Sequence, residues 1–346
     1  MAGLDLAFLG DYRATLDGEP ISGFESARVR ALLAYLAVEA EHPHRREALA
    51  ALLWPERPEA GARASLSQAL FNLRSILGDR RRTPPLLVVT AQTIGMNNAA
   101  GATVDVTSFT SLLQVCAQHP HPQIEMCEAC RQRLQEAVAL YGGSFLQDLS
   151  VDDSVSFDEW VLLRREHLHR LVMEVLGWLT AGYERRGEYA QGLQYAWRQV
   201  ALDPWREEAQ RQLMRLLALN GQRTAALAQY RVCCELLDKE LAVEPAAETV
   251  ALYEQIRQGL VVALPRPLSR RCPLLSRWSR GRSPAYPSRL APSLWPASAS
   301  WLIWRAGSRR HCAAREGLAL WWGSPAAARR CSCASSPTGP WRPTPT

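Results

Sequence analysis

Two segments in the second half of the chain repeat each other at an offset of 34 residues. The stretches "YERRGEYAQGLQYA", which starts at Tyr183, and "LALNGQRTAALAQY", which starts at Leu217, align Gly187 with Gly221. This is the period of tetratricopeptide repeats, in which two helices joined by a tight turn pack on the next pair. The repeat therefore predicts stacked helix pairs rather than a sheet in this part of the chain.

Two repeats are fewer than a free-standing array needs, so flanking helices must complete the stack. Helical spacing of apolar residues over 128–141 and 155–175 supplies them. Because the pattern from Val104 to about Gly259 is helical almost throughout, we expect an all-α tetratricopeptide-like domain over 104–263.

The first hundred residues carry a different pattern. Residues 4–21 alternate apolar and polar side chains around a "DGEP" turn, which predicts a short antiparallel sheet. Helical periods follow at 26–41, 45–54 and 63–77, and then two β-type runs, Leu86–Thr90 and the residues around Ile94. Strands, three helices and a hairpin in this order are typical of a winged helix-turn-helix domain, which we place at 1–103.

The expected fold class is thus mainly α with a small β component, followed by an irregular C-terminal tail. The net charge of +6 belongs to that tail: it is about 0 for residues 1–103, −7 for 104–264 and +13 for 265–346. The tail, 264–346, is rich in Arg, Pro, Ser and Trp and has no sustained period, so we expect it to be unstructured or translated out of frame. Shifted by one frame, the codons for "WWGSPAAARR" can encode a G-x-x-x-x-G-K-T phosphate loop.

The helix 63–77 has two unlike faces. The core-facing stripe holds Leu66, Ala69, Leu70, Leu73, Ile76 and Leu77, and the opposite arc holds Ala64, Ser67, Gln68, Phe71, Asn72, Arg74 and Ser75. Gln and Asn can pair with adenine, and Phe can meet a thymine methyl group, so this arc suits the major groove. A solvated helix face is the alternative interpretation.

We therefore expect two sets of DNA-contacting residues. The base-reading candidates are Arg63, Ser67, Gln68, Phe71 and Asn72. The candidates for the DNA backbone, where contacts set register without reading sequence, are Arg28, Arg30, Arg45, Arg46, Arg74, Ser75, Arg80, Arg81, Arg82, Thr90, Gln92 and Thr93.

Four blocks of the chain resemble the AfsR/SARP-type transcriptional regulators. They are "FLGDYRATLDGEPI", "ARVRALLAYLAVEAEHPHRREALAALLWPE", "ARASLSQALFNLRSILGD" and "LYGGSFLQDLSVDDSVSFDEWVLLRREHLHRL", in the family's order and spacing over residues 4–260. The resemblance implies an OmpR-like winged helix with Arg63–Leu77 as recognition helix and Thr90–Asn97 as wing. It further implies a bacterial transcriptional activator domain that dimerises and contacts RNA polymerase at promoter direct repeats.

A second cluster, "CAQHPHPQIEMCEAC", joins two predicted helices. Cys127 and Cys130 form a Cys-x-x-Cys knuckle, and Cys116 with His119 can complete a tetrahedral structural zinc site, with His121 as a spare imidazole. Ordinary packing of buried thiols is the alternative.

The chain has no hydrolase or metalloprotease motif and no in-frame phosphate loop, so we expect no enzyme and no small-molecule substrate. Without a signal peptide or a long apolar run, a cytoplasmic location away from membranes is expected. The function that these patterns favour is a sequence-specific DNA-binding activator. A helical-repeat interaction scaffold, or the regulatory front of a P-loop ATPase switch, is the alternative.

Overall fold

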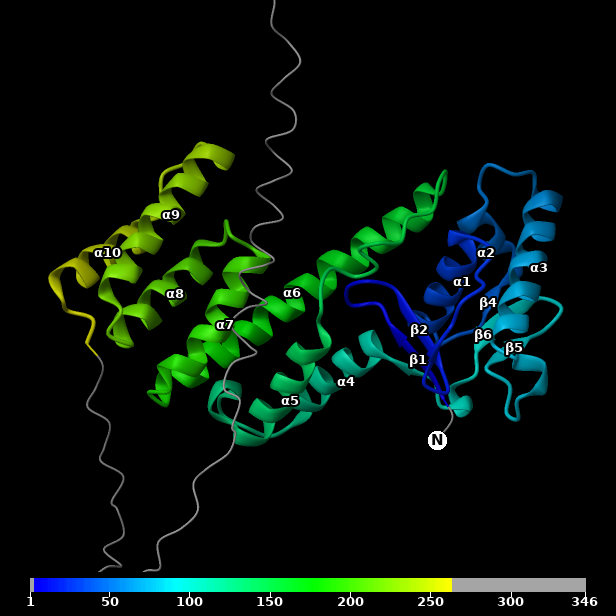
Figure 1. Ribbon diagram of the computed structural model, residues 1–346, viewed down its shortest axis with the longest axis horizontal. Helices are drawn as coiled ribbons and strands as arrows, with labels where there is room; N and C mark the ends of the chain where they lie inside the picture. The colour runs from blue at the N-terminus through cyan, green and yellow to red at the C-terminus, as the bar shows by residue number, and fades with distance from the viewer. Residues whose placement is uncertain (1–2, 263–346) are drawn as a thin grey trace, which may run out of the picture. The chain divides into compact units, whose positions relative to one another are not determined.

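The computed structural model describes residues 3–262, which lie within one compact unit (Figure 1). The tail predicted at 264–346 lies outside the described residues. Within them the fold is mainly helical with a small β component near the N-terminus, as predicted. None of the helices over 3–262 combines the length and the apolarity that a membrane span requires.

The chain opens with a small sheet of strand order β3-β2-β1-β7. Strands β1 (Leu4–Ala7), β2 (Arg13–Leu16) and β3 (Glu19–Pro20) form the predicted antiparallel meander. Strand β7 (Thr103–Val104) lies parallel to β1, with Leu6 opposite Val104. The last residues of the N-terminal part therefore return to its first strand.

Three helices follow the meander: α1 (Ala27–Val38), α2 (Arg46–Leu53) and α3 (Glu59–Ile76). Helix α3 begins four residues earlier than predicted, directly after Pro58, whose ring fixes φ at −55°. Strands β5 (Leu87–Val89) and β6 (Thr93–Met96) form the predicted hairpin, and β4 (His44–Arg45) pairs with its β6 edge. This is a winged helix with α3 as its third helix.

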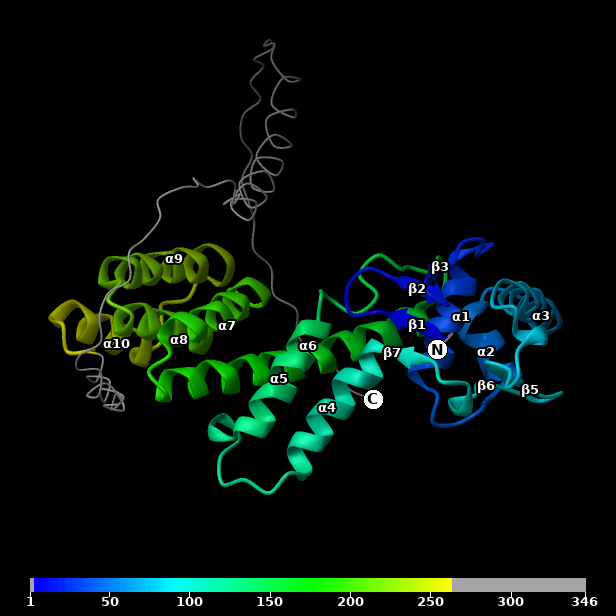
Figure 2. The ribbon, with the colours of Figure 1, turned by 60° about the horizontal axis from the view of Figure 1, so that its bottom comes forward.

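The helical part contains α4 (Asp105–Gln118), α5 (Glu128–Leu140), α6 (Val155–Arg185), α7 (Tyr189–Leu202), α8 (Glu207–Leu219), α9 (Arg223–Leu241) and α10 (Ala247–Gln258). Helices α4 and α5 lie side by side (Figure 2). Helix α6 contacts α2 at one end and packs along α7, so it connects the winged helix with the helix pairs.

The two repeat turns predicted from the sequence have the same geometry. Gly187 and Gly221 have left-handed φ values of +71° and +78°. In each turn the residue after the glycine donates its N–H to the carbonyl five residues back, Glu188 to Tyr183 at 2.9 Å and Gln222 to Leu217 at 2.8 Å. Both turns are Schellman motifs, which glycine favours because it has no Cβ.

One hydrophobic core extends from β1 to the end of α6, and a second fills the space among α7, α8, α9 and α10. Polar contacts also join the winged helix to the helical part. The Asp105 carboxylate, at the start of α4, accepts hydrogen bonds from the Phe8 and Leu9 N–H groups at 2.7 and 2.8 Å. The Trp160 indole of α6 donates to Glu39 at 2.8 Å, and Arg164 forms an ion pair with the same carboxylate. No flexible linker separates the two parts, because β7 ends where α4 begins.

Candidate nucleic-acid interface

Helix α3 buries its leucines and exposes its small polar face. Leu66, Leu70 and Leu73 are between 0 and 5% exposed, and they hold the helix against α1 and α2. The exposed side chains on the other face are Arg63, Ala64, Ser67, Gln68, Phe71 and Ser75. Phe71 is 55% exposed on this face.

A hollow of about 710 Å³ lies beside the N-terminal half of α3. Its lining comes from the start of α2, from α3 and from the hairpin turn: Arg45, Arg46, Glu47, Arg63, Leu66, Ser67, Ala91, Gln92 and Thr93. The structure thus brings together six of the predicted DNA-contacting residues from three separate segments.

Arg46 joins these segments. Its guanidinium donates to the Ser67 hydroxyl at 3.2 Å, and its backbone N–H donates to the Gln92 carbonyl at 2.9 Å. The Ser67 hydroxyl in turn donates to the Arg63 carbonyl at 2.8 Å. The hairpin turn and the exposed face of α3 are therefore held in register through a single arginine.

Arg63 is paired within the protein. Its guanidinium lies 2.7 Å from a Glu47 carboxylate oxygen and 2.6 Å from a Glu59 oxygen, and all three side chains are substantially exposed. Exposed ion pairs contribute little free energy, about 0 to 1 kcal/mol, so a phosphate or a base edge can replace these carboxylates at small cost.

The turn between β5 and β6 is tightly bonded. The Thr90 hydroxyl accepts hydrogen bonds from the Gln92 N–H at 3.2 Å and the Thr93 N–H at 2.8 Å. Gln92 is exposed beside the hollow that α3 borders. The predicted wing residues therefore form a compact tip that stands next to the helix.

The C-terminal half of the exposed face carries an aromatic–cation pair. The Arg80 guanidinium lies 5.5 Å from the centroid of the Phe71 ring, a distance at which cation–π attraction is effective. Arg80 and its neighbour Arg81 are both exposed in the short 3-10 helix after α3. Arg80 and Arg81 therefore place positive charge beyond Phe71, next to the C-terminal end of α3.

Asn72 is placed differently from the prediction. It is 8% exposed, its side-chain carbonyl accepts from the Glu25 N–H, and its amide donates to the Gly23 carbonyl, both at 3.4 Å. The helical wheel assigned Asn72 to the solvent face, but the segment between β3 and α1 covers that side of α3. Asn72 is thus occupied in holding this segment.

Four arginines of the predicted backbone-contacting set are also engaged elsewhere. Arg28 donates to the Asp152 carbonyl at 2.8 Å, and Arg30 lies 5.9 Å from the Tyr12 ring centroid. Arg74 donates to the fully buried Asp79 carboxylate at 3.0 Å, and Arg82 pairs with Asp17 at 2.5 Å. These contacts hold loops and strands of the domain together, and contact of the four arginines with the DNA backbone stays a prediction.

One cation that the sequence reasoning missed lies at the start of α3. Arg57 is about half exposed, donates to the Ser65 hydroxyl at 2.6 Å and lines a hollow of about 580 Å³ with Gln68. Its position in the turn that leads into the third helix, within "WPERPE", was the available signal.

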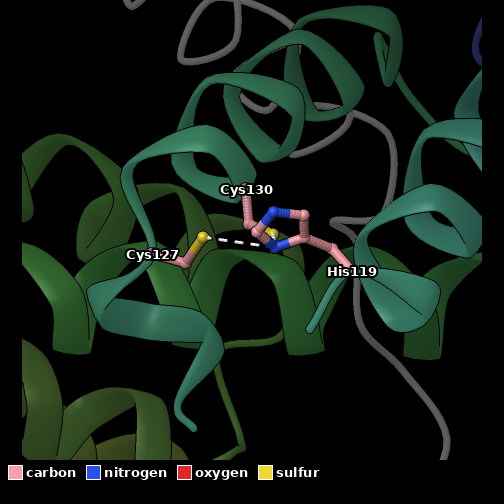
Figure 3. A group of neighbouring side chains, drawn as sticks. All are labelled: His119, Cys127 and Cys130. Atoms are coloured by element: carbon pink, nitrogen blue, oxygen red, sulfur yellow. Dashed lines mark hydrogen bonds between the residues drawn. The ribbon is translucent and has the colours of Figure 1, made fainter. Parts of the chain in front are cut away.

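The predicted cysteine and histidine cluster forms between α4 and α5 (Figure 3). The ligand atoms of His119, Cys127 and Cys130 all lie within 4.8 Å of one another. Hydrogen bonding from the Cys130 N–H lowers the pKa of the Cys127 thiol, whereas burial raises the pKa of the Cys130 thiol to about 12. The fourth predicted ligand, Cys116, is not in this group, because its thiol points to the Cys130 carbonyl at 3.9 Å. The spare imidazole, His121, bonds to the Cys116 carbonyl at 3.0 Å.

Residues 104–257 match the family model of the bacterial transcriptional activator domain. The matched range covers the helical part of the chain, from β7 to α10. The match agrees with the resemblance to SARP-type regulators, and a winged helix precedes the matched domain as the resemblance implied.

Known relatives agree with this assignment. The transcriptional regulatory protein EmbR of Mycobacterium tuberculosis and of Mycobacterium bovis is 28% identical over 257 residues, 73% of this chain and 63% of the relative. The chain therefore spans less than two thirds of the length of these curated relatives. The structure of Mycobacterium tuberculosis EmbR in complex with a low-affinity phosphopeptide matches with a TM-score of 0.54 and 24% identity, over 75% of this chain and 66% of that one. This likeness concerns the fold.

Proposed function

We propose that this regulator is a sequence-specific DNA-binding transcriptional activator that reads the major groove with α3. The observation that carries the proposal is the uncharged, exposed face of α3, with Gln68 and a 55% exposed Phe71, in a winged helix that precedes a bacterial transcriptional activator domain. In the major groove, an amide such as that of Gln68 can pair with adenine and a phenyl ring can meet a thymine methyl group.

The structure supports a division of roles among the candidates. Ser67, Gln68 and Phe71 face the groove, and Arg63 joins them by exchanging its carboxylate partners for DNA. Arg45 and Arg46 near the wing, Arg57 before α3, and Arg80 with Arg81 after it hold the two phosphate backbones. Such phosphate contacts position the helix, while base contacts specify the site.

The activator domain supplies contacts to a second copy and to RNA polymerase in this proposal. This domain exposes several large apolar side chains, which suits protein partners: Leu162 (57%), Leu163 (71%), Trp197 (47%), Trp205 (47%) and Val232 (45%). We further propose that the chain acts by binding rather than by catalysis, in the cytoplasm where bacterial promoters and polymerase are found.

The test is DNA binding by the full chain as a function of salt. Fluorescence anisotropy with fragments of the promoter upstream of its own gene, at about 50 to 200 mM salt, should give a steep log–log decline of affinity if several phosphates are neutralised. The variant Arg46→Ala with Arg80→Ala should reduce the slope by about two. Arg231→Ala, on the exposed surface of α9, is the matched control and should leave the slope unchanged.

Two results would contradict the proposal. Absence of binding at low salt would favour an interaction scaffold whose winged helix packs on a protein. An equal effect of Arg231→Ala and of the double variant would show that binding does not pass through the α3 face.

A further inference from the structure

The segment between α4 and α5 brings three metal-binding side chains to one point. His119 is the first residue after α4, Cys127 is the residue at which α5 is capped, and Cys130 lies in the first turn of α5. The two helix ends and the intervening loop therefore converge on this cluster (Figure 3).

The distances fit a tetrahedral zinc ion. The Nδ1 atom of His119 lies 3.6 Å from the Cys127 sulfur and 3.6 Å from the Cys130 sulfur. Zinc bonds of about 2.3 Å to sulfur and about 2.0 to 2.1 Å to nitrogen, at a tetrahedral angle, place the two ligand atoms about 3.6 Å apart. Coordination of one zinc ion accounts for both distances with the single lone pair of the His119 Nδ1 atom.

The Cys127 sulfur has hydrogen-bond donors that suit a thiolate ligand. The backbone N–H groups of Ala129 and Cys130 bond to the Cys127 sulfur, and the Arg133 guanidinium contributes positive charge to both Cys127 and Cys116. Donors of this kind orient metal-binding thiolates and offset their charge.

Cys116 can take the fourth position if its thiol turns away from the Cys130 carbonyl. It is 1% exposed on the last turn of α4, and its thiol is within hydrogen-bonding reach of both the Cys130 carbonyl and the Cys130 thiol. The resulting order is Cys-x-x-His followed by Cys-x-x-Cys, two close pairs on either side of one loop.

We propose that His119, Cys127, Cys130 and Cys116 bind one structural zinc ion that clips the end of α4 to the start of α5. Three thiols release their protons to solvent on binding, and His119 binds through Nδ1 as a neutral imidazole. Four protein ligands leave no open position, so the ion serves the fold and does no chemistry.

The loop that this zinc site closes lies over the C-terminal end of α6. The Glu125 carbonyl approaches Gly182 so closely that a Cβ there would overlap it, Arg185 donates to the Gln123 side chain at 2.5 Å, and Arg186 donates to the Met126 carbonyl at 3.2 Å. The end of α6 leads into the first repeat turn, at Gly187. The zinc ion therefore stabilises the place where the helix pairs begin.

The test is the zinc content of the full chain purified without chelators, together with titration of its free thiols. We expect about one zinc ion per chain in the wild type, and less than about 0.2 in Cys127→Ser and in His119→Ala. Cys234→Ser, a half-buried thiol on α9, is the matched control and should retain the ion. This control and the loss in Cys127→Ser also separate the site from the four cysteines after residue 264.

Cobalt(II) substitution tests the ligand set directly and does not depend on DNA binding. The wild type should show the visible ligand-field bands of a tetrahedral ion, and Cys116→Ser should lose about a third of the thiolate-to-cobalt charge-transfer intensity. Unchanged intensity overturns the assignment of Cys116.

Two outcomes overturn the whole proposal. One is less than about 0.2 equivalents of zinc in the wild type, with or without a Cys127–Cys130 disulfide in the thiol titration. The other is retention of zinc by both ligand variants. Because a variant can simply misfold, the far-ultraviolet circular dichroism of each one is measured, and chelator treatment of the wild type should lower its Tm reversibly.

Discussion

Phe71 is an apolar ring that the fold exposes instead of burying. It is 55% exposed with Arg80 stacked 5.5 Å from its centroid, so removing the ring exposes no core and creates no cavity. We expect Phe71→Ala to change the free energy of unfolding by less than about 0.5 kcal/mol. The same variant should lower the ratio of specific to random DNA affinity by about fivefold or more, the loss of one base contact.

Anisotropy with promoter and scrambled duplexes measures this ratio. Val243→Ala, a similarly exposed apolar side chain in the segment after α9, is the control and should leave it unchanged. If Phe71→Ala weakens both duplexes equally, the ring does not discriminate between bases.

Gln68 and Asn72 lie one turn apart on α3 but should respond differently to substitution. Asn72 holds the Glu25 N–H and the Gly23 carbonyl from a nearly buried position, whereas Gln68 is exposed. Asn72→Ala should lower the free energy of unfolding by about 1 to 2 kcal/mol, and Gln68→Ala should leave it within about 0.5 kcal/mol. Urea denaturation measures both, and equal stability of the two variants would contradict the packing described for Asn72.

Asp79 connects α3 with the wing hairpin. Its carboxylate is fully buried and accepts from the Leu86 N–H at 2.6 Å, the Leu87 N–H at 3.0 Å and the Arg74 guanidinium at 3.0 Å. Asp79→Ala leaves these donors without an acceptor, so we expect a loss of about 3 kcal/mol in unfolding free energy. Glu59→Ala, which removes only an exposed partner of Arg63, should cost less than about 1 kcal/mol in the same urea titration.

The repeat turns allow a comparison of two glycines. Gly221 has a left-handed φ of +78° and open space where a Cβ would point, so Gly221→Ala should cost about 1 to 2 kcal/mol of backbone strain alone. Gly182 lies inside α6, five residues before the first repeat turn, and has no left-handed strain. A Cβ there would overlap the Glu125 carbonyl, so Gly182→Ala should cost more than Gly221→Ala. Thermal unfolding of both variants measures the two losses of stability. A larger loss for Gly221→Ala would show that the loop between α4 and α5 can move away from α6 at little cost.

The helical repeat was predictable from the sequence because a left-handed turn position favours glycine, which can be recognised in the sequence. Gly187 and Gly221 stand at corresponding positions, and their spacing alone indicates the period. The two-residue strands β4 and β7 were not foreseen, since they have no period of their own and exist only through pairing with β6 and β1.

The DNA-contacting candidates were predicted unevenly for a similar reason. A helical wheel locates the stripe that packs on the other helices, but it does not show which loop crosses the opposite side. Asn72 is covered by the segment before α1. Arg28 donates a hydrogen bond to the Asp152 carbonyl, which is 124 residues away in sequence. The cluster of His119, Cys127 and Cys130 was easier to predict, because its members are close in sequence.

The core of the winged helix continues through α4, α5 and α6 of the helical part, so these two parts should unfold together. The contacts of Asp105 with Phe8 and Leu9, and of Glu39 with Trp160, cross the boundary near residue 104. We expect calorimetry of the full chain to show one cooperative transition that includes both parts. Asp105→Ala should shift this transition downward as a whole, and a transition that splits into two would contradict the shared core.

The direct passage from β7 into α4 also matters for promoter architecture. With Val104 in the N-terminal sheet and Asp105 already in α4, the direction of α3 is fixed relative to α7–α10. Two chains on neighbouring sites must then obey the rotational phase of the duplex, about 10 to 10.5 base pairs per turn. Inserting about half a turn between the sites would place the second chain on the far side of the DNA, and a full turn would restore its alignment. In the proposed function, the interior packing of the protein would thereby set the spacing of the sites to which two chains bind.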